Sequence, residues 1–152
     1  MTIPMLKVSI ITVVRNNQSY IEGCIKSVID QKYQNYEYII IDGGSTDGTL
    51  DIIKKYRDHI SILISEPDCG IYDAMNKGIK LATGDIVGIL NSDDFYNSND
   101  VLTEVVREFS QKEVDSVFAD LVYVDRKKTN KIVRYYKSAN FKPNKFAYSW
   151  MD

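Results

Sequence analysis

The chain has 152 residues, of which 44% are hydrophobic and 26% are charged, and its formal net charge is −2. This length and composition are typical of one globular domain with an ordinary hydrophobic core, and the slightly acidic balance gives no electrostatic reason to expect nucleic-acid binding. No apolar stretch approaches the ~20 residues of a membrane-spanning helix, and the N-terminus has no recognisable signal peptide. The two cysteines, Cys24 and Cys69, form neither a disulfide framework nor a metal-ligand motif. We therefore expect a cytoplasmic protein with one domain over residues 1–152.

Strand-like and helix-like segments alternate along the first two thirds of the chain, which predicts an α/β domain with a mainly parallel sheet. Ser19 and Glu22 have the spacing of a capping box at the start of the first helix. The run 8–14 is typical of a strand buried on both faces, and the apolar run 85–90 is typical of a buried strand. The expected strands are residues 8–14, 38–41, 60–64 and 85–90, and the expected helices are residues 20–29, 50–56, 71–82 and 101–109.

Beyond Gln111 the pattern changes. Residues 116–125 and 132–137 are two strand-like segments joined by a polar, basic turn, which predicts an antiparallel hairpin after the last helix. We expect the basic turn to be solvated, with contact to a membrane surface or to an anionic acceptor as the alternative. The aromatic tail, residues 141–152, has no period that predicts a helix or a strand.

Polar clusters follow all four predicted strands of the parallel sheet. The carboxyl ends of parallel strands share one edge, and open α/β sheets bind their ligands there. Each cluster alone could be an ordinary turn, because Gly, Asn, Asp and Ser are turn-forming residues. The connections on the opposite edge, however, hold no similar carboxylate and glycine clusters. The four clusters are Arg15-Asn16-Asn17, Asp42 to Asp47, Glu66 to Gly70, and Asn91 to Asp94.

The adjacent carboxylates Asp93 and Asp94 lie at the end of the fourth predicted strand. Hard cations such as Mg²⁺ or Mn²⁺ bind oxygen ligands, and they commonly take one or two carboxylates while substrate phosphates complete the coordination. The pair therefore indicates a divalent-cation site shared with a nucleotide diphosphate, although acidic pairs also occur in plain surface turns.

Four blocks of the chain, in this order, resemble family 2 glycosyltransferases, which have the GT-A fold. The blocks are residues 8–16, 42–49, 68–78 and 82–94. The resemblance covers roughly residues 7–125 and is to bacterial members that build envelope polysaccharides. It implies a Rossmann-like, mainly parallel sheet with flanking helices. It also implies an inverting transfer of sugar from a nucleotide-diphospho-sugar, most simply a UDP-sugar, to a saccharide or lipid-linked acceptor.

The resemblance implies roles for residues in all four blocks. Asp42 would accept a hydrogen bond from an N–H of the base, and Asp94 would coordinate the cation that bridges the two phosphates. Asp93 would bind the ribose or share the metal. The remaining donor-site residues implied by the resemblance are Thr12, Val14 and Asn16 around the nucleoside, Asp68 at the ribose or donor region, Asn76 and Lys77 near the phosphates or sugar, and Ser45 and Asn91. Tyr72 is a further candidate, because it follows Gly70 at the edge of the expected site.

Some of these residues have an ordinary structural explanation as well. Asp47 is expected to cap a helix, and Asn76 and Lys77 could simply lie on an exposed helix surface. The metal motif of the family is usually acidic at its first and third positions, whereas this chain has Ser92 at the first position. The carboxylates of Asp93 and Asp94 nevertheless preserve the oxygen ligands.

In the family, the catalytic base lies well downstream of the metal motif, so we expect it beyond Asp152 and expect this domain to lack the acceptor and base region. A module that binds a nucleotide-sugar without turning it over is the alternative function. A receiver-type signalling domain does not fit, because it needs an acidic pair where this chain has Arg15-Asn16-Asn17. We also consider association with the inner face of the cell membrane, and homo-oligomers formed through the aromatic tail.

Overall fold

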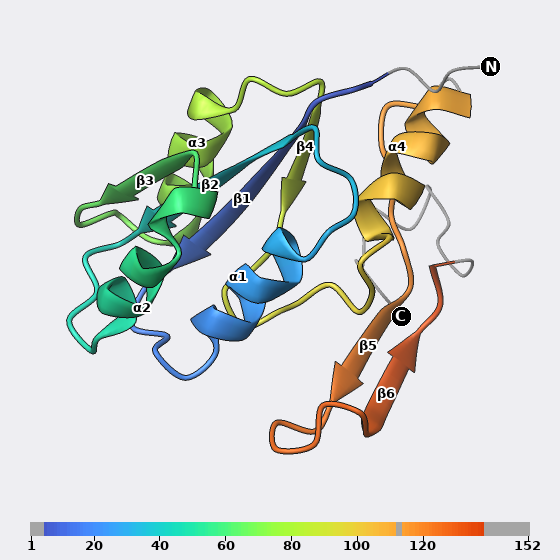
Figure 1. The fold of residues 1–152 in the computed structure, drawn as a ribbon. Helices are drawn as coiled ribbons and strands as arrows, with labels where there is room; N and C mark the ends of the chain where they lie inside the picture. The colour runs from blue at the N-terminus through green and yellow to red at the C-terminus, as the bar shows by residue number, and fades with distance from the viewer. Residues whose placement is uncertain (1–4, 112–113, 139–152) are drawn as a thin grey trace. The chain divides into compact units, whose positions relative to one another are not determined.

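The computed structural model describes residues 5–111 and 114–138 (Figure 1). Two compact units divide the chain after Lys112. The single domain expected over residues 1–152 stays a prediction, and the two units are described separately.

Unit 1 is built on a four-stranded parallel sheet with the strand order β3-β2-β1-β4. Its strands are β1 (Val8–Val14), β2 (Tyr36–Asp42), β3 (Ile62–Ser65) and β4 (Ile86–Ile89). The first strand pairs with β2 from Val8 to Val14 and with β4 from Val8 to Ile11. Every residue of β1 is buried, which explains its nearly continuous β-branched sequence. Because all pairings are parallel, the four carboxyl ends share one edge, as expected.

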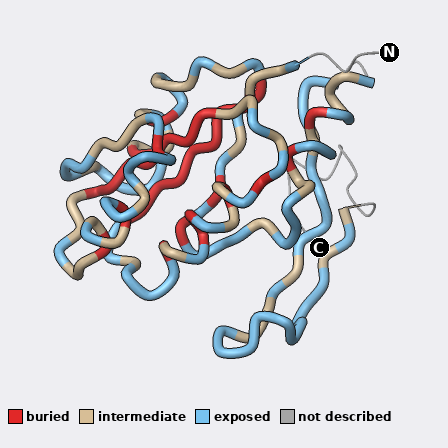
Figure 2. The backbone as a smooth tube through the Cα atoms, viewed as in Figure 1, coloured by how far each residue is buried: buried red, intermediate tan, exposed pale blue. Residues whose placement is uncertain are grey.

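Helices cover both faces of this sheet. They are α1 (Ile21–Ile29), α2 (Thr49–Lys55), α3 (Ile71–Leu81) and α4 (Val101–Gln111), with a short 3₁₀ helix η1 (Arg57–His59) after α2. Buried side chains of α1, α2 and α4 pack on one face of the sheet, and Ala74 of α3 packs on the other. Figure 2 shows that burial is concentrated in the central strands and the inner sides of the helices. None of the described helices combines the length and hydropathy needed to cross a membrane.

Two local predictions for unit 1 were wrong. Helix α1 starts at Ile21 with Tyr20 at the N-cap and no side-chain cap; Glu22 instead accepts a hydrogen bond from Tyr56 at 2.5 Å. Strand β4 is not buried on both faces, since Val87 is 46% exposed and Ile89 44% exposed. The reason is its position at the edge of the sheet, where α3 lies over β1 and β2 instead.

A polar cluster that the sequence did not reveal lies at the amino end of the sheet. The buried carboxylate of Glu37 accepts hydrogen bonds from Lys7 Nζ (2.8 Å), Ser9 Oγ (2.6 Å), and the Thr83 backbone N (2.6 Å) and hydroxyl (2.9 Å). Burial alone would raise the pKa of Glu37, but these hydrogen bonds outweigh it and lower the pKa from 4.5 to about 2. The cluster ties β1, β2 and the α3–β4 connection together.

Unit 2 contains an antiparallel hairpin, as predicted, formed by β5 (Leu121–Val124) and β6 (Ile132–Tyr136). Leu121 pairs with Tyr136, and the register shifts between Tyr123 and Val124. The first strand is shorter than the predicted 116–125, because β6 ends at Tyr136 and offers no partner to residues before Leu121. The aromatic tail, residues 141–152, lies outside the described residues.

Candidate functional site

A cavity of about 270 Å³ opens at the carboxyl edge of the sheet in unit 1. Its volume is close to the lower end of the roughly 300–1,000 Å³ range of small-molecule sites. Residues from three of the four polar clusters contribute to its wall, together with the first turns of α3. The lining residues are Val13, Val14, Arg15, Asp68, Gly70, Ile71, Ala74 and Ser92.

The side chains of Asp68 and Arg15 both lie close to Gly43. Asp68 Oδ1 accepts a hydrogen bond from the Gly70 backbone N at 2.9 Å. A Cβ built on Gly43 would overlap Asp68 Oδ2 and would lie 3.4 Å from Arg15 Cδ. Only a residue without a side chain at position 43 therefore allows this arrangement. A ligand in the cavity meets an acidic and a basic side chain together.

The loop after β2 is held by its own hydrogen bonds. Asp42 is fully buried, and its carboxylate accepts hydrogen bonds from the Ser45 backbone N and hydroxyl and from the Ser65 hydroxyl at 2.7 Å. These hydrogen bonds engage the Asp42 carboxylate in this structure, and the expectation that it accepts a hydrogen bond from a base stays a prediction. Asp42 joins the loops that follow β2 and β3. Helix α2 has Gly48 at its N-cap and no side-chain cap there, but the preceding Asp47 accepts a hydrogen bond through Oδ1 from the Thr49 backbone N at 3.0 Å.

Asn16 links the end of β1 to the same loop. Its backbone has φ 52°, a left-handed conformation that asparagine tolerates better than most residues. The Asn16 backbone N donates to Ser45 Oγ at 2.8 Å, and Asn16 Oδ1 accepts from the Thr46 backbone N at 2.8 Å. Asn16 and Ser45 are thus brought together at the site edge, where they fix the loop.

Thr12 does not line the cavity. It has no exposed surface, and its hydroxyl accepts a hydrogen bond from the Tyr38 hydroxyl at 3.1 Å. Cys24 packs beside this pair and donates from Sγ to the Asn91 carbonyl oxygen at 3.4 Å. Burial raises the pKa of the Cys24 thiol to about 11. These buried contacts hold the side chains beneath the end of β1 in place, and Val14 lines the cavity.

Hydrogen bonds hold the acidic loop after β4, residues 91–94, in place. Ser92 is buried and accepts a hydrogen bond from Asn17 Nδ2 at 2.8 Å. Asn91 Nδ2 donates to Asp94 Oδ2 at 3.2 Å, and the Asp94 backbone N donates to the Asn91 carbonyl at 3.0 Å. Partial burial raises the pKa of Asp94, and the negative charge of Asp93 raises it further. The hydrogen bond from Asn91 lowers this pKa but does not cancel the increase.

The donor atoms of this loop fit a divalent cation that is shared with a ligand. In the part of the chain that the structure describes, no three Asp, Glu, His or Cys residues gather closely enough to hold a metal by themselves. Asp93 and Asp94 supply two adjacent carboxylates, and their mutual repulsion disfavours ionisation of Asp94, which a bound cation would relieve. Mg²⁺ and Mn²⁺ suit such a site when phosphates complete the coordination.

Three expected residues on α3 lie outside the cavity wall. Tyr72 is 77% exposed, and Asn76 is also exposed. Lys77 forms ion pairs with Glu66 at 2.9 Å and with Asp73 at 3.4 Å. Lys77 therefore braces the β3–α3 connection in this structure.

The cavity wall also includes residues that the sequence did not single out. Arg15 stood in the first polar cluster without an assigned role, and its position directly after a buried strand was a usable signal. Ser92 was noted only as a departure from the metal motif. Ile71 and Ala74 follow the same apolar helical spacing as core residues, so no sequence signal distinguished them.

Comparison with known proteins identifies the family. The family model described as "Glycosyl transferase family 2" matches residues 9–149. The chain belongs to glycosyl transferase family 2. The resemblance seen in the four sequence blocks is thus confirmed.

Two similar proteins are named as glycosyltransferases of PGL/p-HBAD biosynthesis and of teichuronic acid biosynthesis. The chain is 35% identical over 128 residues to the PGL/p-HBAD biosynthesis glycosyltransferase of Mycobacterium bovis BCG, an alignment that covers 82% of this chain and 48% of that protein. It is 41% identical over 90 residues to the putative teichuronic acid biosynthesis glycosyltransferase TuaG of Bacillus subtilis, covering 57% of this chain and 36% of that protein. The matched part of the chain thus spans about half the length of the first relative and less than that of the second.

Solved structures of glycosyltransferases have a similar fold. S. aureus TarS 1–349 in complex with UDP-GlcNAc matches with a TM-score of 0.66 and 27% identity, over 72% of this chain and 33% of that chain. The mannosyltransferase PcManGT from Pyrobaculum calidifontis, in complex with GDP-Man and Mn²⁺, matches with a TM-score of 0.63 and 25% identity, over 77% and 35%. The expected α/β fold with a mainly parallel sheet, flanking helices and a hairpin is confirmed.

Proposed function

We propose that the protein is an inverting glycosyltransferase that moves a sugar from a nucleotide-diphospho-sugar, most simply a UDP-sugar, to a saccharide or lipid-linked acceptor. The observation that carries this proposal is the cavity at the carboxyl edge of the sheet, next to the loop that bears Asp93 and Asp94. The family membership and the nucleotide-sugars named for the two similar structures support it.

The cavity offers chemically suitable surfaces for a nucleoside. Val13 and Val14 provide apolar contact for a base, and the planar guanidinium of Arg15 can stack on a base or pair with a phosphate. Asp68 Oδ1 is occupied by the Gly70 backbone N. Its second oxygen can accept a hydrogen bond from a ribose hydroxyl or from the imide N–H of uracil. Asp68 is thus a second candidate, beside Asp42, for accepting a hydrogen bond from the nucleoside.

The loop after β4 suits the diphosphate end of the donor. Asp93 and Asp94 would hold a Mg²⁺ or Mn²⁺ ion, and Asn91 and Ser92 fix the loop that carries them. Such an ion, when bound, supplies Lewis-acid stabilisation of the negative charge on the leaving diphosphate. The acceptor hydroxyl would attack the anomeric carbon from the opposite face, with a carboxylate taking its proton. Among the described residues, 5–111 and 114–138, we assign none as this catalytic base.

Binding of UDP with and without Mn²⁺ tests the site assignment. Calorimetric titration of the protein should show that Mn²⁺ strengthens UDP binding, and Asp94→Ala should abolish that increase. In the presence of Mn²⁺, we expect the Asp94 variant to bind UDP more than about tenfold more weakly than the parent. Removing residues that merely support metal ligands already has an effect of this size. The matched control is Asp51→Ala, an exposed aspartate on α2. Unchanged Mn²⁺-dependent binding by the Asp94 variant would refute the assignment.

Turnover separates the transferase from a module that only binds the donor. Hydrolysis of a UDP-sugar, or glycosylation of an added acceptor, would support the transferase. Mn²⁺-dependent UDP binding that depends on Asp94, without either reaction, would favour the binding module.

A further inference from the structure

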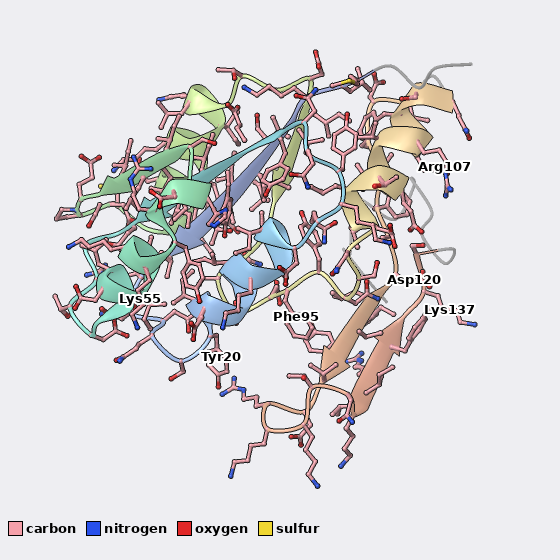
Figure 3. All side chains as sticks on the ribbon, viewed as in Figure 1. Tyr20, Lys55, Phe95, Arg107, Asp120 and Lys137 are labelled. Carbon is pink, nitrogen blue, oxygen red and sulfur yellow. The ribbon has the colours of Figure 1, made fainter. Side chains whose placement is uncertain are left out.

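The hairpin of unit 2 concentrates positive charge in a protein whose overall charge is negative. Residues 126–137 contain six of the 19 lysines and arginines of the chain and none of its 21 acidic residues. Four of these cations, Arg126, Lys127, Lys128 and Lys131, lie in the exposed turn between β5 and β6. In Figure 3, long nitrogen-tipped side chains extend from this turn, and Lys137 lies at the other end of β6.

Two carboxylates of the hairpin region, those of Asp125 and Asp120, accept hydrogen bonds from backbone and hydroxyl groups of the same region. Asp125, directly before the turn, accepts hydrogen bonds through Oδ1 from the backbone N of Lys127 at 2.9 Å and of Lys128 at 3.0 Å. Asp120 accepts from the Tyr135 hydroxyl and from the Ser138 backbone N at 2.8 Å. The first carboxylate therefore orders the turn, and the second closes the open end of the hairpin.

Large apolar side chains are exposed on the same hairpin. The most exposed aliphatic ones are Val133 at 66% and Ile132 at 58%, and Tyr123 is exposed by 53%. Pairing of Val124 with Ile132 and of Val122 with Tyr135 places these four side chains on one face of the hairpin, whereas Tyr123 pairs with Arg134 on the other. Figure 2 shows the hairpin as exposed or intermediate, with no buried segment.

We propose that this hairpin docks onto the surface of an anionic lipid bilayer. Binding at a bilayer interface combines electrostatic attraction to anionic headgroups with burial of apolar side chains among them. The hairpin presents both, since its turn is cationic and the start of β6 is aliphatic. A soluble polyanion would be recognised by the cations alone and would leave Ile132 and Val133 in water. This inference concerns a surface of unit 2 and does not depend on the donor site in unit 1.

Sedimentation with lipid vesicles at low ionic strength tests the proposal on the full 152-residue chain. The vesicles consist of phosphatidylcholine alone or of phosphatidylcholine with phosphatidylglycerol. We expect binding only when phosphatidylglycerol is present. Each lysine near an anionic surface strengthens binding about fivefold, so the triple variant Lys127→Gln, Lys128→Gln, Lys131→Gln should bind roughly a hundredfold more weakly.

A control triple variant removes the same charge elsewhere. Lys54→Gln, Lys55→Gln and Lys80→Gln lie on exposed positions of α2 and α3 and should leave vesicle binding close to that of the parent. Equal losses in both triple variants would show a response to net charge alone and would overturn the proposal.

A second variant tests the apolar part. The pair Ile132→Thr and Val133→Thr keeps all the charges and the β-branching, so the hairpin should remain folded. It should still weaken vesicle binding several-fold, since less apolar surface enters the interface. Undiminished vesicle binding by this pair, together with equally tight binding of the parent protein to heparin, would identify a soluble-polyanion site and refute the lipid proposal.

Discussion

Replacing Glu37 by glutamine removes the negative charge from the cluster that joins β1, β2 and the α3–β4 connection. The glutamine side chain has the same size but only one acceptor oxygen, and its amide group would face the donors Lys7 and Thr83. We therefore expect the variant to fold with the same architecture and a lower free energy of unfolding.

The size of the loss follows from the shift in the carboxyl pKa. The pKa of Glu37 falls from 4.5 to about 2 in the folded state, which corresponds to about 3 kcal/mol if the shift is fully expressed in stability. The Lys7 side chain is 38% exposed, so solvent screens part of its attraction. We expect Glu37→Gln to lower the free energy of unfolding at pH 7 by about 2 kcal/mol.

The lowered pKa of Glu37 also determines how the free energy of unfolding changes with pH. Because the folded pKa lies below the unfolded one, the stabilisation is fully present above about pH 5 and is lost as the pH falls toward 2. The parent protein should lose this part of its stability over that interval, whereas Glu37→Gln should not. The difference between the two proteins should therefore narrow toward pH 2.

Urea unfolding at pH 7 and at pH 3 measures this difference as a change in midpoint at unchanged slope. The control is Glu104→Gln, the same chemical change at an exposed position of α4, which should shift the free energy of unfolding by less than about 1 kcal/mol. Equal midpoints for Glu37→Gln and the parent at pH 7, or a difference that persists undiminished in acid, would refute the reasoning.

Two further predictions concern the site and its support. Gly43→Ala should displace the Asp68 carboxylate and weaken UDP binding about tenfold in calorimetry, which corresponds to one lost hydrogen bond. Gly23→Ala, which meets nothing within 4 Å on α1, should leave binding unchanged, and equal affinities for the two variants would contradict the geometry. With a thiol reagent at pH 8, exposed Cys69 should react at once, whereas Cys24 should react only after urea is added, because burial both shields it and raises its pKa to about 11. Two rapidly reacting thiols in the folded protein would disprove the burial of Cys24.

The central part of the fold was predictable from sequence because a strand buried on both faces has a nearly continuous apolar, β-branched sequence. The bounds of β1 match the prediction, since every residue from Val8 to Val14 is inside the core. The exposed face of β4 could not be foreseen, because Val87 and Ile89 are as apolar as buried strand residues. Their exposure follows from which strand lies at the edge, and periodicity carries no information about strand order.

The candidate site was predictable as a region but not residue by residue. Asp42 and Asp68 both follow strands, and their surroundings decide which one faces a ligand. Asp42 is occupied by Ser65, which lies 23 positions away in sequence, whereas Asp68 borders the cavity. Similarly, Thr12 is fully buried and hydrogen-bonded to Tyr38 of the neighbouring strand, although it lies on the same face of β1 as Val14. Such pairings across strands depend on register, which single-sequence patterns do not specify.

The strand order itself has a consequence for how the ligand site can change. The chain proceeds outward from β1 to β2 and β3, and α3 then crosses the opposite face to return it to the far side of β1 as β4. The strand order thus reverses at the junction of β1 and β4, and open α/β sheets bind their ligands in a crevice at such a switch point. Exchanging the residues around that crevice should change which donor is accepted while the crevice remains, so specificity can drift on an unchanged scaffold.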